Sequence, residues 1–199
     1  MRSKGRRGVF ALLLLLQGAL IGSVVARDLF LMFAFWSLSA IPLFLLVGIW
    51  GGVERERAAV QSAAAAFIGN AFLLAGIMVA FYFAEPHSFS LQEIPAGSFS
   101  GKLVEVFGVS ISVADLILAL FGLGFVARLP IWPVHGWFFR VVDEAPLTVL
   151  GIVVGAMVPV GLYLFMRLSL SLFPEAGVAL SRFLLALGLV NLLVAAVSL

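Results

Sequence analysis

The stretch Leu129-Pro130-Ile131-Trp132-Pro133-Val134-His135-Gly136-Trp137 interrupts an apolar run that is long enough to cross a lipid bilayer. Pro130 and Pro133 each lack an amide hydrogen and clash with the preceding helical turn, so a straight helix cannot continue through this stretch. Two interpretations are open. If the break lies within the membrane, its freed carbonyls need partners from protein or water, as in breaks that line buried polar cavities. Alternatively, the prolines mark the end of the span at the membrane surface.

The composition around this stretch excludes a water-soluble domain. Of the 199 residues, 63% are hydrophobic and 11% are charged, and the mean hydropathy is +1.21. An integral membrane protein of this length has room for about six crossings of ~20 residues each. The absence of cysteine excludes disulfides, iron–sulfur clusters and thiolate metal sites. A net charge of +2 gives no indication of nucleic-acid binding.

The apolar runs predict an all-α integral membrane protein with a single transmembrane domain over residues 1–199. The basic segment before the first run fits an uncleaved first helix, which we favour, or a secretory signal peptide cleaved after Ala26. Pro42 predicts a kink in the second span. The polar loop over residues 85–105 is expected outside the membrane. The predicted spans are residues 9–26, 29–50, 60–83, 107–142 with the break at Pro130 and Pro133, 147–167 and 178–199.

The basic residues predict the orientation. With a cytoplasmic N-terminus, seven Lys or Arg residues fall in cytoplasmic segments and four in outer segments. Because basic residues concentrate on the cytoplasmic side, we expect a multi-pass protein of the inner (cytoplasmic) membrane with both termini in the cytoplasm. The seven are Arg2, Lys4, Arg6, Arg7, Arg55, Arg57 and Arg140, and the four are Arg27, Lys102, Arg167 and Arg182.

Ionisable side chains within the spans are candidates for function, because a charge in lipid is energetically costly. Arg128 is the strongest candidate, since it directly precedes the break. His135 could pass protons along a water chain, or it could be a packed histidine bonded to a carbonyl freed by one of the prolines. Asp143 and Glu144 either flank the fifth span at the surface or take up protons. Asp115 lies too far along the helix to pair with Arg128 and is expected near the outer boundary.

Other polar and small residues in the spans predict helix packing. Gln17, Asn70 and Asn191 are expected to form interhelical hydrogen bonds, and small residues permit close helix contact at Gly18-x-x-x-Gly22, at Gly151-x-x-x-Gly155 and on the face of residues 63–66 with Gly69. The sequence contains no phosphate-binding loop, metal-ligand cluster or nucleophile–base pair. We therefore expect no cofactor, no metal and no catalytic site in this chain.

Two blocks of the sequence carry a family resemblance. The stretch from Arg128 to Trp137, followed by Glu144-Ala145-Pro146 and Tyr163-Leu164-Phe165-Met166-Arg167, resembles the antiporter-type membrane subunits of respiratory complex I, particularly the M type (chain 4 of NADH:quinone oxidoreductase). Subunits of Mrp cation/proton antiporters and membrane-bound hydrogenases are similar. The upstream block comprises Asp28-Leu29-Phe30-Leu31, Phe35-Trp36, Ile41-Pro42 and Gly48-Ile49-Trp50-Gly51.

The resemblance implies one antiporter-like repeat of five helices plus an extra helix, with the break inside the membrane. It covers a piece of the family's length, since the helices that normally precede Val9 and the second repeat have no counterpart here. In the family, the broken helix carries a lysine that passes protons, and that position is Arg128. The family's glutamate in the second span is Ser37, and two further lysine positions are Gln61 and Pro159. The usual Pro-Asp-Ala-His reads Phe139-Arg140-Val141-Val142.

These departures predict a non-pumping or weakly conducting subunit of a complex I-like, proton-translocating respiratory assembly, because an arginine keeps its proton in nearly all protein environments. Its expected partners are other membrane subunits, including antiporter-like ones, and lipids. Arg128 should then meet an acid, from this chain or a neighbouring subunit, or a ring of carbonyls. One alternative is an active proton or cation/proton transporter that uses Arg128, His135 and a partner's acid. A second alternative is a structural or assembly protein.

Overall fold

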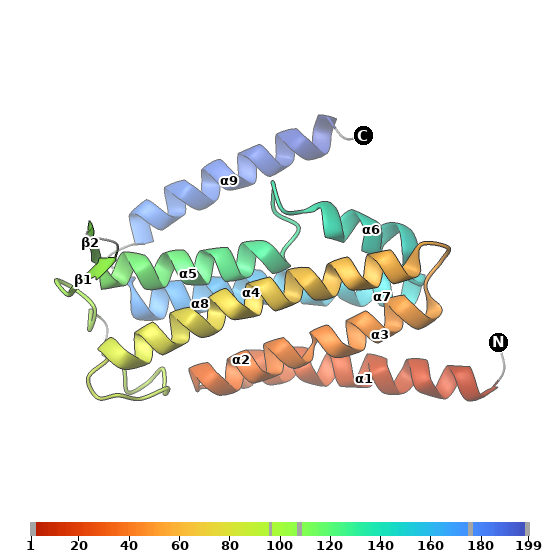
Figure 1. The fold of residues 1–199 in the computed structure, drawn as a ribbon, viewed down its shortest axis with the longest axis horizontal. Helices are drawn as coiled ribbons and strands as arrows, with labels where there is room; N and C mark the ends of the chain where they lie inside the picture. Colours follow the sequence, from red (N-terminus) through yellow and green to blue (C-terminus); the bar gives the residue numbers. More distant parts are fainter. Residues whose placement is uncertain (1–2, 96, 107–108, 175–176, 198–199) are drawn as a thin grey trace.

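The computed structural model describes residues 3–95, 97–106, 109–174 and 177–197, and most of them are helical. Figure 1 shows a bundle of long helices lying roughly along one direction, with a small two-stranded hairpin at one end. The helices are α1 (Ser3–Val25), α2 (Leu29–Leu38), α3 (Ala40–Trp50), α4 (Arg55–Phe83), α5 (Val113–Arg128), α6 (Gly136–Glu144), α7 (Leu147–Ile152), the π-helix η1 (Val153–Met157), α8 (Val158–Leu172) and α9 (Gly177–Val197), and the strands are β1 (Leu103–Val106) and β2 (Val109–Ser112).

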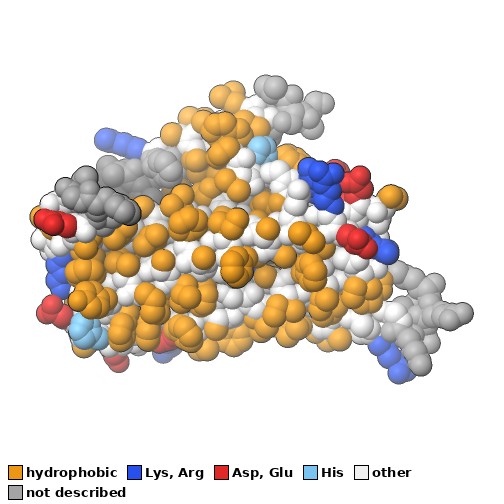
Figure 2. Space-filling model, in the orientation of Figure 1, with side chains coloured by type: hydrophobic (Ala, Val, Ile, Leu, Met, Phe, Trp, Pro, Cys, Tyr) orange, Lys and Arg blue, Asp and Glu red, His pale blue; other side chains and the backbone are white. Residues whose placement is uncertain are grey.

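The chain is mostly helical, and within the residues that the structure describes, four stretches have the length and hydropathy of membrane spans, which confirms the predicted all-α integral membrane fold. Leu184–Val194 is a shorter apolar helix. Hydrophobic side chains cover the flank of the bundle, and the charged side chains visible in Figure 2 gather mainly toward its two ends. The four candidate spans are Arg7–Val25, Leu29–Trp50, Arg55–Phe83 and Leu147–Leu172.

The predicted break is present between α5 and α6. The first helical segment ends at Arg128 and the second begins at Gly136. The N-terminal start of this span differs from the prediction at residue 107, because α5 begins only at Val113. Residues 109–112 form β2, which pairs antiparallel with β1. Phe107 itself lies outside the described residues. The alternation of serine with apolar residues over residues 109–112 has the two-residue period of a strand, which explains the later start of the helix.

The second span is interrupted as Pro42 predicts. It divides into α2 and α3 at Ser39, three residues before the proline. The Ser39 hydroxyl donates a 2.6 Å hydrogen bond to the carbonyl of Trp36. This interruption lies against the end of α5, so two irregular helix segments meet inside the bundle.

Glycines allow α4 and α5 to pack closely along their length, as Figure 1 shows. A Cβ atom on Gly69 would lie 2.6 Å from the carbonyl oxygen of Gly124, and one on Gly124 would lie 2.6 Å from Cγ of Leu73. Close contact at Gly69 is therefore confirmed. The two predicted glycine pairs, Gly18 with Gly22 and Gly151 with Gly155, do not both mediate such close helix contact. Gly22 packs against the ring of Phe35, whereas no heavy atom lies within 4 Å of a Cβ on Gly18, Gly151 or Gly155.

The bundle has two distinct ends. The turn end contains residues 51–54 and the end of α6, where the Gly52 amide donates to the Glu144 carbonyl at 2.9 Å. The loop end contains residues 84–95 and 97–102 with the strands β1 and β2, and the Leu91 amide donates there to the Arg27 carbonyl at 3.1 Å. The basic residues that were assigned to opposite sides of the membrane thus lie at opposite ends: Arg55, Arg57 and Arg140 at the turn end, and Arg27 and Lys102 at the loop end. Arg2 lies outside the described residues.

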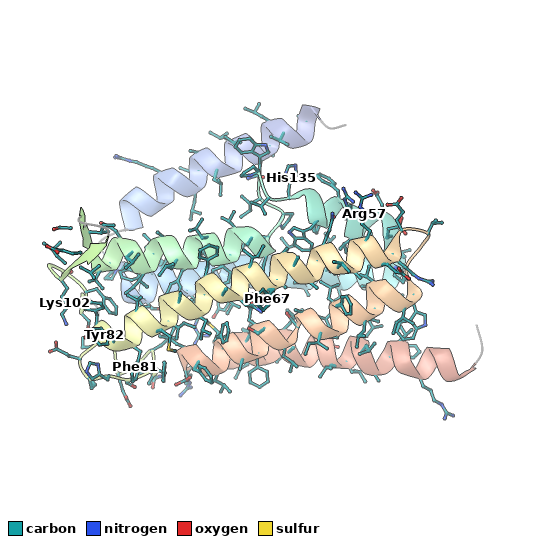
Figure 3. All side chains as sticks on the ribbon, viewed as in Figure 1. Arg57, Phe67, Phe81, Tyr82, Lys102 and His135 are labelled. Atoms are coloured by element: carbon teal, nitrogen blue, oxygen red, sulfur yellow. The ribbon has the colours of Figure 1, made fainter. Side chains whose placement is uncertain are left out.

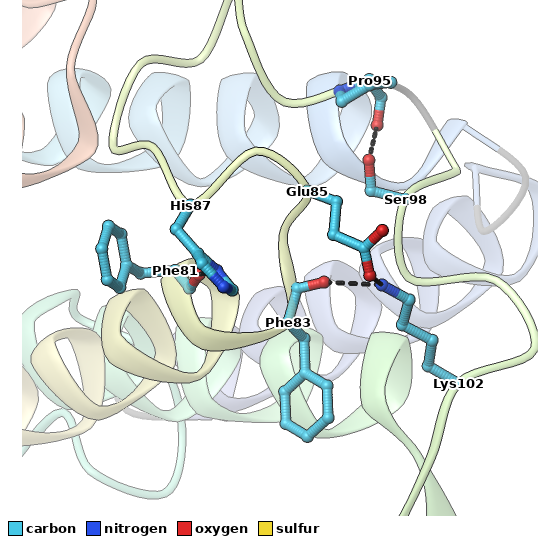
Figure 4. A network of polar contacts seen from close by, with 7 residues as sticks. All are labelled: Phe81, Phe83, Glu85, His87, Pro95, Ser98 and Lys102. Carbon is cyan, nitrogen blue, oxygen red and sulfur yellow. Dashed lines mark hydrogen bonds and ion pairs between the residues drawn. The ribbon is translucent and has the colours of Figure 1, made fainter.

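Lys102 ties the loop to the end of α4. Figure 4 shows its ammonium group donating to the carbonyl of Phe83 at 2.9 Å and to the carboxylate of Glu85 at 3.0 Å. The hydrogen bond and positive charge of Lys102 lower the pKa of the Glu85 carboxyl. Nδ1 of His87 lies 3.0 Å from the Phe81 carbonyl oxygen in the same corner.

Candidate functional site

Arg128 is the last residue of α5, directly before the break, and its side chain is only 1% exposed. Figure 1 shows that α5 ends near the middle of the bundle's length. The guanidinium therefore lies among helices rather than at either end. A charged group in such a position is stable only if protein groups replace its water shell.

Three neutral acceptors surround the Arg128 guanidinium. One terminal nitrogen donates to the Trp36 carbonyl at 2.8 Å and to Oδ1 of Asn70 at 3.2 Å. The other donates to the Ser39 hydroxyl at 3.0 Å. The guanidinium carbon lies 4.3 Å from the centre of a Trp36 ring, a favourable cation–π position. We call Arg128, Trp36, Ser39 and Asn70 the arginine cluster.

The arginine cluster contains no carboxylate, contrary to the acid partner that we expected as one possibility. Among the described residues, no Asp or Glu forms an ion pair with Arg128. The acceptors are instead one backbone carbonyl, one amide oxygen and one hydroxyl, so the ring of carbonyls that we expected as the alternative is not formed either. Ser37, at the position of the family's glutamate, has a buried hydroxyl without a hydrogen-bond partner among the described residues.

Two of the three acceptors of Arg128, the Trp36 carbonyl and the Ser39 hydroxyl, belong to no sequence motif that predicts them. Asn70 was predicted to form an interhelical hydrogen bond, and its bond from α4 to α5 confirms that prediction. The Trp36 carbonyl and the Ser39 hydroxyl were missed. Pro42 indicated an irregular helix here, but the carbonyl that a proline frees directly lies four residues earlier, at Leu38, so it did not single out Trp36 or Ser39.

His135 lies at the end of the break, apart from the arginine cluster. Its ring packs edge-on against Phe139, with centroids 5.3 Å apart. Nδ1 is buried and has no hydrogen-bond partner among the described residues, so it does not make the carbonyl bond expected of a packed histidine. Nearby, the Trp132 amide donates to Oδ1 of Asn191 at 2.9 Å, which connects the break to α9. Figure 3 shows His135 on the side of the break that faces α9.

Asp143 and Glu144 lie at the turn end, at the end of α6. Oε2 of Glu144 accepts a 3.1 Å hydrogen bond from the Glu54 amide, so this carboxylate holds the turn before α4. α7 begins after Pro146 without a side-chain cap. The structure thus brings Asp143 and Glu144 together, but it separates them from Arg128 and His135. Asp115 is exposed in the first turn of α5, at the loop end, so it lies at one end of the bundle and away from Arg128.

Comparisons with known proteins agree with the arrangement of these helices. The family model described as NADH:quinone oxidoreductase/Mrp antiporter, TM, matches residues 26–198. NAD(P)H-quinone oxidoreductase chain 4 1 of Synechococcus sp. (strain JA-3-3Ab) is 31% identical over 189 residues, which cover 95% of this chain and 34% of the relative. NAD(P)H-quinone oxidoreductase chain 4 2 of Thermosynechococcus vestitus is 33% identical over 192 residues, with coverages of 95% and 34%.

A solved structure has the same fold. A chain in respiratory complex I from Thermus thermophilus with bound NADH superposes with a TM-score of 0.73 at 27% identity, covering 90% of this chain and 36% of that chain. The present chain therefore spans about one third of the length of the relatives that it matches.

Proposed function

The chain belongs to the NADH:quinone oxidoreductase/Mrp antiporter membrane family, and from this membership we propose that it is an antiporter-like subunit of a complex I-like, energy-converting assembly. Its partners in this proposal are other membrane subunits, antiporter-like ones included. The inner (cytoplasmic) membrane is the location consistent with such an assembly. The similarity to chain 4 of NAD(P)H-quinone oxidoreductase and to a chain of respiratory complex I supports this proposal.

Within this assembly, we propose that the chain does not pump protons through its own broken helix. The observation that carries this proposal is the arginine cluster, in which a buried guanidinium is held by neutral acceptors. A proton-passing group must release and regain its proton during each cycle. An arginine surrounded by hydrogen-bond acceptors keeps its proton and its position, so Arg128 acts as a fixed charge that holds two interrupted helices together.

A second candidate function, proton transfer through His135, is favoured by one observation. The buried Nδ1 of His135 has no hydrogen-bond partner among the described residues, and an imidazole can exchange protons near neutral pH. In that case Asp143 and Glu144 are candidate groups for proton uptake at the turn end. Arg128 would then set the local potential without exchanging its own proton.

Measuring proton translocation by the purified assembly distinguishes the non-pumping function from proton transfer through His135. We expect the His135→Ala variant, isolated with its native partners and placed in lipid vesicles, to take up as many protons per electron as the unmodified assembly. A matched Phe139→Ala variant controls for lost packing, because Phe139 contacts the His135 ring but cannot carry a proton. A lower proton-to-electron ratio for His135→Ala alone, with electron transfer retained, would contradict the non-pumping proposal.

A further inference from the structure

A hollow lined by charges of both signs lies at the turn end, between the start of α4 and the end of α6. Its volume is about 340 Å³. Since ~10–15 Å³ of such space is enough for one water molecule, the hollow has room for a polar group larger than a single ion. It is lined by Glu54, Arg57, Ala58, Arg140, Asp143 and Glu144. We call it the mixed-charge hollow.

The charged groups of the mixed-charge hollow differ in the hydrogen bonds and ion pairs that they already form within the chain. Glu144 fixes the wall, because its carboxylate accepts from the Glu54 amide and its carbonyl from the Gly52 amide. Arg57 and Glu54 form a long pair of 3.8 Å, with side chains 63% and 65% exposed, and such exposed pairs are weak. Within the described part of the chain, Arg140 and Asp143 form no ion pair. Two guanidinium groups and two carboxylates are thus available to a ligand.

The mixed-charge hollow lies where the membrane surface is expected. Two candidate spans, Arg55–Phe83 and Leu147–Leu172, begin beside it. An exposed apolar stripe runs from it along α4, with Val60 59% and Phe67 78% exposed and the small residue Ala64 between them. Figure 3 shows Arg57 near α6 and Phe67 near the middle of α4. From Arg57 to Phe67 the helix rises ~15 Å at 1.5 Å per residue, which is half of a ~30 Å hydrocarbon core. The stripe therefore matches an acyl chain of one leaflet.

We propose that the mixed-charge hollow binds the phosphoethanolamine head group of an aminophospholipid, with an acyl chain along the α4 stripe. Arg57 and Arg140 hold the phosphate, because a guanidinium donates paired hydrogen bonds to phosphate oxygens. Asp143 and Glu54 accept hydrogen bonds from the ammonium. Three carboxylates against two guanidiniums repel a purely anionic head group, and a choline group lacks the N–H donors that the carboxylates require. This proposal is independent of whether the chain conducts protons.

Lipid binding by the full chain tests the proposal. The chain is purified in mild detergent, stripped of lipid and titrated with phosphatidylethanolamine, phosphatidylcholine or phosphatidylglycerol of identical acyl chains, with native mass spectrometry as the readout. We expect phosphatidylethanolamine to bind most tightly. The Arg57→Gln/Arg140→Gln variant should bind it about tenfold more weakly, since charge-assisted hydrogen bonds are lost, and Asp143→Asn should remove the preference over phosphatidylcholine. Arg55→Gln, a neighbouring arginine outside the hollow, should bind normally.

Several results would overturn the proposal. Equal binding of phosphatidylethanolamine and phosphatidylcholine, or tighter binding of phosphatidylglycerol, would contradict the assigned head group. Unchanged lipid affinity in the double variant, with normal helix content by circular dichroism, would remove the hollow from lipid binding. If the purified variant bound lipid normally but no longer co-purified with its partner subunits from the native membrane, the hollow would be a protein interface. Binding of free phosphoethanolamine as tightly as the lipid would exclude a role for the α4 stripe.

Discussion

Arg128 shows how a buried charge can be held without an opposite charge. The desolvation cost of a guanidinium is large, and here three neutral oxygens and an indole face offset part of it, while the buried Nε has no hydrogen-bond partner among the described residues. The acceptors come from two segments that can approach Arg128 closely. Trp36 and Ser39 flank the interruption before Pro42, and Asn70 follows Gly69, where α4 comes close to α5. Losing one acceptor should leave the charge partly unsatisfied.

We therefore expect Asn70→Leu to destabilise the chain by about 1.5–3 kcal/mol, the range for hydrogen bonds to charged groups. Asn191→Leu is the matched control, because Asn191 accepts from the neutral Trp132 amide and should cost about 0.5–1.5 kcal/mol. Both variants exchange an amide for an apolar group of similar size. Unfolding in mixed micelles at increasing denaturant concentration gives the two free energies. Equal losses would show that the charge of Arg128 adds nothing to its hydrogen bond with Asn70.

The elements of the fold could be predicted where the sequence itself breaks a helix. Pro130 and Pro133 located the break between α5 and α6, and Pro42 located the interruption at Ser39. The hairpin could not be predicted, because its short strands adjoin an apolar run of helical length and hydropathy alone does not separate them. The acceptors of Arg128 were also out of reach, apart from Asn70, because their convergence depends on how α2, α4 and α5 pack. Packing contacts between elements far apart in sequence follow from the whole fold rather than from a local pattern.

The crossing of α4 and α5 depends on glycine, and this dependence can be tested. We expect Gly69→Ala to destabilise the chain by about 1–3 kcal/mol through overpacking, because the added carbon would lie 2.6 Å from the Gly124 carbonyl and 2.7 Å from Cγ of Arg128. Gly122→Ala on α5 is the control. Its added carbon meets no heavy atom within 4 Å, so the higher helix propensity of alanine should stabilise the chain by about 0.5–1 kcal/mol. The thermal unfolding temperature in detergent should therefore fall in Gly69→Ala and rise in Gly122→Ala. A destabilisation of similar size in both variants would contradict the close crossing.

The charged side chains gather at two ends of the bundle that are separated by an apolar flank, as Figure 2 shows. The turn end contains Arg55, Arg57 and Arg140, and the hydrogen bonds of Glu144 hold its parts together. The loop end contains Lys102, paired with Glu85, and the Arg27 carbonyl bonded to Leu91. The excess of basic residues at one end comes from the first seven residues of the sequence, and because basic residues favour the cytoplasmic side, it predicts a turn end in the cytoplasm. The assignment of Asp143 and Glu144 as proton-uptake candidates depends on which side that end faces, whereas the proposed lipid site does not.

The absence of cysteine makes this orientation directly measurable, since a single introduced thiol is the only reactive one in the chain. Val53, fully exposed at the turn end, and Leu103, 66% exposed at the loop end, form a matched pair of apolar surface positions. With a membrane-impermeant maleimide on intact spheroplasts, we expect Leu103→Cys to be labelled and Val53→Cys to be labelled only after the membrane is disrupted. The reverse pattern would place the turn end outside and contradict the orientation predicted from the basic residues. Labelling of both thiols in intact spheroplasts would contradict the placement of the two ends on opposite sides of the membrane.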